Sequence, residues 1–136
     1  MAYGFHFRYR QSGGAPTVLD IVSADTDLAA GDLVNLESGQ LDLAVTDDSG
    51  LLGAVIETLA SGSASVTKAK AIVDADAVYG VTDANARLMG ATLDISGGTG
   101  AQTVGSTSKA DLTVVQTSTA TEETLVQITH GEHFSN

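Results

Sequence analysis

The chain has 136 residues, of which 43% are hydrophobic and only 4% aromatic, and it contains no cysteine. This length suits a single domain with an aliphatic core, and the lack of cysteine excludes disulfides, thiolate metal sites and cysteine nucleophiles. No apolar run approaches the ~18 residues that a membrane-spanning helix needs, and residues 1–16 lack the apolar centre of a signal peptide. We therefore expect a soluble, unprocessed chain with no membrane partner.

Charge is distributed unevenly along the sequence. Residues 1–16 contain Arg8 and Arg10 but no acidic residue, so the remainder holds four basic residues (6 minus 2) and 17 acidic ones, or −13. A body this acidic repels phosphate backbones, and we expect no direct binding of nucleic acid. Solubility, for example in a salty environment, is a second sufficient explanation of the negative charge.

The first ten residues have a pattern of their own. Aromatic residues occupy every second position, so an extended chain would place four rings on one face. The N-terminal segment extends beyond these ten residues and ends in Gly13-Gly14-Ala15-Pro16, a flexible break that holds the only proline. One interpretation is an ordinary first strand whose rings face the core. The charge reversal favours another, an extended N-terminal arm and hinge over residues 1–16 that docks on a neighbouring chain, followed by a single all-β domain over residues 17–136. The residues predicted to bind the partner are Tyr3, Phe5, Phe7, Arg8, Tyr9 and Arg10.

After the hinge, short β-type runs are separated by turn residues. Leu41, Leu43 and Val45 alternate with polar or small residues, which indicates a strand with one buried face. The predicted strands are Val18–Val22, Asp32–Glu37, Leu41–Thr46, Leu51–Glu57, Val66–Val73, Ala77–Val81, Thr92–Ile95, Leu112–Gln116 and Leu125–His130.

A spacing of about ten residues per strand favours a sandwich or barrel over alternating strands and helices. We predict a compact all-β fold, a β-sandwich or barrel of β-tulip or jelly-roll type, with at most one short helix. That helix is placed at residues 84–89, capped by Asp83 and ended by Gly90. Residues 96–108 are rich in Gly, Ser and Thr, and we expect there an exposed loop, or a surface that orders only on a partner.

The sequence contains little that points to catalysis. No serine lies in a nucleophile-elbow context, and no glycine-rich turn leads from a strand into a helix. The His130-Gly131-Glu132-His133 spacing and the aspartate pairs at 25–27, 47–48 and 74–76 allow a metal site, but turn chemistry explains the aspartates and none has the full EF-hand pattern. We predict no enzymatic activity, no cofactor and no metal.

Several segments together have a familiar order of glycines, small residues and strands. They are Ala30-Gly31-Asp32-Leu33-Val34, Gly39, Leu41-Asp42-Leu43-Ala44, Leu52-Gly53-Ala54-Val55-Ile56-Glu57, Val66-Thr67-Lys68-Ala69-Lys70, Gly90-Ala91-Thr92-Leu93-Asp94-Ile95 and Asp111-Leu112-Thr113-Val114-Val115. This order resembles the head decoration, or capsid cement, proteins of tailed bacteriophages, and it covers most of residues 18–130.

The resemblance implies a structural protein on the outer surface of the phage head, and therefore of the virion. Such a protein would bind the major capsid protein, assemble as a homotrimer at three-fold and quasi-three-fold positions, and stabilise the shell, with N-terminal arms docking on neighbouring subunits. The alternative is a carbohydrate- or calcium-binding β-sandwich module of a viral fibre or surface assembly. Tyr79 is the only aromatic residue between residues 10 and 133, which leaves little ring surface for stacking on sugars.

Overall fold

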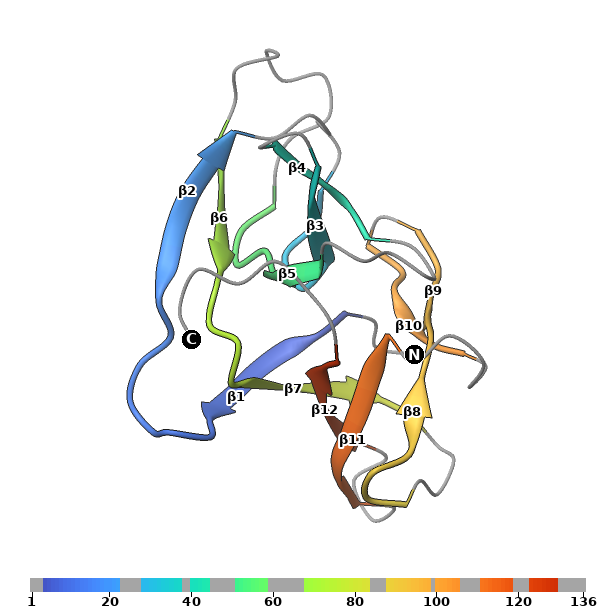
Figure 1. Cartoon of the computed structure of the whole chain (residues 1–136). Coiled ribbons are helices and arrows are strands. Elements are labelled where there is room, and N and C mark those ends of the chain that lie inside the picture. Colours follow the sequence, from blue (N-terminus) through green and yellow to red (C-terminus); the bar gives the residue numbers. More distant parts are fainter. Residues whose placement is uncertain are drawn as a thin grey trace.

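The computed structural model describes residues 4–22, 28–37, 40–44, 51–58, 68–83, 88–98, 100–105, 111–118 and 123–129 (Figure 1). Every helix or strand assigned within these ranges is a β-strand, which confirms the all-β prediction. Residues 84–87 of the predicted helix lie outside the described residues, and the described Leu88 and Met89 are not helical.

Twelve short strands are assigned in the part of the chain that the structure describes. They are β1 (His6–Arg10), β2 (Val18–Val22), β3 (Leu33–Glu37), β4 (Gln40–Leu43), β5 (Leu51–Ala54), β6 (Lys68–Ile72), β7 (Ala77–Thr82), β8 (Thr92–Leu93), β9 (Ile95–Ser96), β10 (Thr103–Val104), β11 (Leu112–Ser118) and β12 (Glu123–Ile128).

The strands form antiparallel sheets that do not close on themselves. The largest has the order β1-β7-β12-β11-β8, and smaller sheets have the orders β4-β3-β5, β2-β6 and β10-β9. In Figure 1 the five-stranded sheet lies in the lower half, and β2 to β6 lie together above it. This arrangement of several open sheets is consistent with a β-sandwich and not with a closed barrel.

Two groups of buried side chains form the core. One lies around the five-stranded sheet and includes Phe5, Tyr79 and Leu112, and the other joins the smaller sheets through residues such as Val34 and Leu41. Apart from the two rings, the buried members are Val, Leu, Ile and Ala, as the composition predicts. The tight packing leaves no space at Gly53, where a Cβ would lie 2.0 Å from the Ile72 carbonyl oxygen.

Two predictions about local structure need correction. The predicted strand Thr92–Ile95 is divided at Asp94 into β8 and β9. The expected exposed loop over residues 96–108 contains β10, and its Gln102 is fully buried. The Gln102 amide accepts from Leu33 N at 2.6 Å and donates to Ala44 O at 3.0 Å, so this polar segment is held by hydrogen bonds to backbone.

The N-terminal segment is also part of the body. β1 pairs antiparallel with β7 as the edge strand of the five-stranded sheet, and Phe5 is only 1% exposed. Among the described residues, this agrees with the alternative interpretation of a first strand with rings in the core for Phe5 and partly for Phe7, whereas Tyr9 is 38% exposed. In this structure the segment docks on its own chain: β7 supplies the pairing edge, and Glu123 and Asp76 supply acidic partners for the arginines.

Candidate interaction site at the N-terminal strand

β1 contains a bulge that breaks the regular alternation expected from the sequence. Phe7 pairs with Tyr79 and Tyr9 with Val78, so Arg8 is the extra residue between them. The three described rings consequently differ in exposure: Phe5 is buried, Phe7 is partly buried against the core, and Tyr9 is 38% exposed. Tyr3, the fourth predicted ring, lies outside the described residues.

Arg8 is paired across the sheet. Its Nε donates to Glu123 Oε1 at 3.1 Å, and its second guanidinium contact is with Glu123 Oε2. The hydrogen bond to Glu123 raises the pKa of Arg8 above its ordinary value. The positive charge of Arg8, which the sequence predicts to contact a partner, is therefore paired with Glu123 of the same chain.

Arg10 holds the end of β1 against the turn before β7. Its Nε donates to Asp76 Oδ1 at 2.9 Å and lies 3.6 Å from Asp74 Oδ1. The backbone N–H of Ser12 donates to Asp76 Oδ2 at 3.0 Å, and that of Thr17 donates to Asp74 Oδ2 at 2.6 Å. Hydrogen bonds from Ser12 and then from Arg10 lower the pKa of Asp76 to about 2. We call these contacts of residues 10, 12, 17, 74 and 76 the clasp.

The start of the segment is tied by backbone contacts. Gly4 N donates to Gln102 O at 2.9 Å, and Phe5 N donates to Gly31 O at 2.7 Å. Gly4 and Gly31 have φ values of +96° and +95°, and each lies beside the other's backbone. The segment is thus fixed at its first described residues and again at the clasp.

These contacts change the set of available partner-binding residues. Phe5 is buried, and Arg8 and Arg10 form ion pairs within the chain, although the Arg8 side chain is still 44% exposed. Phe7 and Tyr9 keep partly exposed rings. Sequence patterning could not identify these internal partners because they lie 64 to 115 residues away along the chain.

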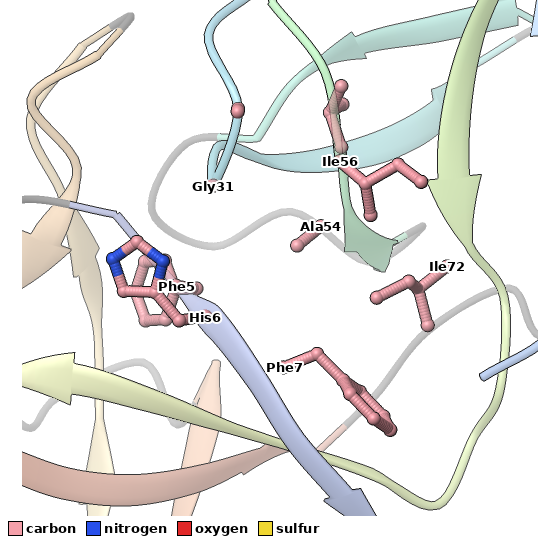
Figure 2. A pocket seen from close by; sticks show the side chains of 9 residues that line it. Phe5, His6, Phe7, Gly31, Ala54, Ile56 and Ile72 are labelled. Atoms are coloured by element: carbon pink, nitrogen blue, oxygen red, sulfur yellow. The ribbon is translucent and has the colours of Figure 1, made fainter. Parts of the chain in front are cut away.

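Beside β1 lies an apolar crevice that sequence reasoning missed. Figure 2 shows Phe5, His6 and Phe7 of the N-terminal segment near Ala54 of β5, Ile72 of β6 and Ile56, which follows β5. The cavity measures about 310 Å³ and is also lined by Ala30, Gly31 and Val55. Ile56 is 47% exposed. The sequence gives only a weak signal for the crevice, because Ile56 is one of several apolar residues in the predicted strand Leu51–Glu57.

The crevice adjoins an unpaired strand edge. β1 is the terminal strand of its sheet, so one side pairs with β7 and the other has no strand partner among the described residues. An edge strand offers backbone N–H and C=O groups to an extended segment from another chain, and an adjacent apolar pocket can receive a side chain of that segment. The arrangement suits the binding of a protein segment.

Other candidate sites receive little support from the parts of the chain that the structure describes. Within them, no group of three or more His, Cys, Asp or Glu could hold a metal ion. Asp74 and Asp76 belong to the clasp, and the aspartates at 25–27 and 47–48 and the histidines at 130 and 133 lie outside the described residues. Tyr79 is 1% exposed, and burial raises its pKa well above the ordinary value, so its ring offers no surface to a sugar.

Among the described residues, no helix has the length and hydrophobicity to cross a bilayer. Comparison with known proteins gave no relatives: no family model, no curated protein and no solved structure matches the chain.

Proposed function

We propose that this chain is a structural protein that decorates the outer surface of a bacteriophage head and stabilises the shell, acting as a homotrimer at three-fold and quasi-three-fold positions. Its partner is the major capsid protein, and it performs no catalysis. The resemblance over residues 18–130 suggests this role, and the structure contributes a surface through which it could act.

The observation that carries the proposal is the edge strand β1 beside an apolar crevice. An extended segment of a shell subunit would add to the free side of β1 and place an apolar side chain against Ile56 and Phe7. Burial of one large aliphatic side chain contributes about 1.5–3 kcal/mol, which corresponds to roughly a ten-fold gain in affinity or more.

Trimerisation strengthens such a weak contact. Three linked crevices turn the second and third docking steps into intramolecular events, so the assembly binds much more tightly than one copy. The strongly acidic chain, with a formal net charge of −11, also disfavours contact with packaged nucleic acid and suits the outside of the shell.

Sedimentation with purified heads tests the proposal. Phage heads from the source lysate, stripped of this protein, are mixed with the purified full chain and pelleted, and the contacted shell protein is identified by cross-linking and mass spectrometry. We expect saturable binding, with cross-links to the major capsid protein. A chain that stays in the supernatant at all concentrations would refute the decoration role.

Paired variants test the crevice separately. Ile56→Glu places a charge at the crevice and should weaken head binding ten-fold or more. Leu19→Glu is the matched control, because Leu19 is 40% exposed on β2 and does not line the crevice. Equal loss with both variants, or no loss with either, would remove the crevice from the mechanism. Thermal unfolding of each variant establishes that it remains folded.

A further inference from the structure

We infer that β1 exchanges between copies of this chain, so that in the oligomer the N-terminal strand of one copy pairs with β7 of its neighbour. The inference rests on the trimeric state in the proposed function and deepens it. In this arrangement the predicted arm, residues 1–16, would dock on a neighbouring chain, and that neighbour would be a second copy of the same protein.

β1 lies far along the chain from the residues that it contacts. Arg8 and Glu123 are 115 residues apart, Arg10 and Asp76 are 66 apart, and Ser12 and Asp76 are 64 apart. The strand is followed by a single covalent connection, residues 11–17. Identical contacts therefore form whether β1 belongs to the same chain or to another copy, which is the condition for strand exchange.

The connection that follows β1, residues 11–17, has a conformation suited to exchange. Residues 11–15 are exposed, and Gly13 and Gly14 have φ values of +85° and +88° with open space where a Cβ would lie. Gly13 N donates to Arg10 O at 2.9 Å, which closes a turn. The return of the chain thus depends on two left-handed residues, whereas an extended connection reaching a neighbour does not need them.

The contacts of β1 also determine which segment can replace it. A displaced β1 would leave the buried site of Phe5 empty, and Asp76 and Glu123 would lose their cationic partners. Only a segment with an aromatic residue and two arginines at matching positions restores all three contacts. The β1 segment of a second copy has this pattern, and cyclic exchange around a three-fold axis satisfies every copy.

Cysteine cross-linking distinguishes the two arrangements, because the chain has no cysteine of its own. Tyr9 lies opposite Val78 across β1 and β7, so a Tyr9→Cys, Val78→Cys variant can form a disulfide between directly paired positions. The purified full chain is separated by size and then oxidised. We expect disulfides between chains in the oligomer fraction and within the chain in the monomer fraction, as seen on non-reducing gels.

Two results would overturn the inference. One is an oligomer fraction that contains disulfides only within single chains. The other is a purified chain that stays monomeric up to millimolar concentration. The first result leaves both the homotrimer and head binding of the proposed function intact. The second also removes the homotrimer, but not head binding, which sedimentation measures separately.

The hinge glycines provide an independent test that does not depend on disulfide geometry. Replacing Gly13 and Gly14 with alanine strains the closed turn but not the extended connection, and should raise the oligomer-to-monomer ratio about ten-fold. Gly90→Ala is the matched control, since Gly90 also has a positive φ of +89° and open space but lies outside the hinge. An unchanged or lower ratio in the hinge variant, or an equal rise in the control, would contradict strand exchange.

Discussion

The guanidinium Nε of Arg10 and the carboxylate Oδ1 of Asp76 lie 2.9 Å apart, although 66 residues separate them in the sequence. This pair closes the end of β1 onto the start of β7, and Ser12 adds a backbone hydrogen bond to the same carboxylate. The clasp explains why a cationic N-terminal segment stays on an acidic body. It also makes the attachment of that segment sensitive to acid.

The first prediction concerns pH and Asp76. Its pKa falls from the ordinary 3.8 to about 2 in the folded chain, so its contribution to stability is complete above the unfolded pKa and is lost as pH falls toward 2. At pH 7 Asp76→Asn should lower the free energy of unfolding by about 1.5–3 kcal/mol, as for other hydrogen bonds to charged groups. The difference from wild type should narrow as pH falls from about 5 to 2. Urea denaturation at a series of pH values measures both.

Asp20→Asn is the control for this titration. Asp20 pairs with Lys70 at 2.9 Å, but both side chains are well exposed, so the substitution should change stability little at any pH. A gap between Asp76→Asn and wild type that stays constant with pH would show that the clasp does not depend on the ionised carboxylate.

The second prediction concerns the rings of the N-terminal segment. Phe5 is 1% exposed within the core, so Phe5→Ala should lower the free energy of unfolding by about 3–5 kcal/mol. Tyr9→Ala, at a ring that is 38% exposed, should cost much less. Denaturant unfolding of the two variants measures this difference. Similar small losses for both would mean that the Phe5 ring does not fill a core site.

The third prediction concerns the buried amide of Gln102. Its side chain accepts from Leu33 N at 2.6 Å and donates to Ala44 O at 3.0 Å. Gln102→Leu keeps a similar volume but leaves buried backbone groups without these partners, at about 1–3 kcal/mol for each unsatisfied group. We expect thermal unfolding at a clearly lower temperature. Stability equal to wild type would indicate that water or a shifted backbone replaces the amide.

The fourth prediction concerns Gly53. A Cβ there would lie 2.0 Å from Ile72 O and 2.8 Å from Tyr79 Oη. Gly53→Ala should therefore destabilise by at least the upper part of the 1–3 kcal/mol typical of overpacking. Adding Tyr79→Phe removes the hydroxyl but not the carbonyl clash, so it should not rescue folding. Gly98→Ala, at a glycine with open space and no positive φ, is the control and should fold normally. Recovery in the double variant would show that the hydroxyl, and not the backbone, sets the limit.

The strand regions were predictable because their signals are local. Val18–Val22 forms β2 as predicted, and the alternation at Leu41 and Leu43 falls within β4. Side chains of a strand point alternately to two faces, so alternation in the sequence indicates a strand. The burial is less regular than the pattern: Leu41 is buried, but Asp42 and Leu43 are both only partly buried. The burial of Gln102 was missed because its hydrogen-bond partners, Leu33 and Ala44, come from distant segments.

The crevice beside β1 could not be anticipated in the same way. It forms where the N-terminal segment passes Gly31 and Ile56, which belong to other parts of the fold. Nothing in the pattern around Ile56 distinguishes a half-exposed side chain at a pocket from one in the core. Its exposure follows from how the sheets meet.

By itself, the sequence determined an acidic, cysteine-free chain of short β-strands with an aliphatic core, since composition and alternation act over a few residues. Only the tertiary structure decided what the N-terminal rings and arginines contact. Phe5, Arg8 and Arg10 could face either a partner or their own body, and the antiparallel pairing of β1 with β7 brings them to core, Glu123 and Asp76. That choice depends on contacts between residues far apart in sequence, for which local patterns carry no information.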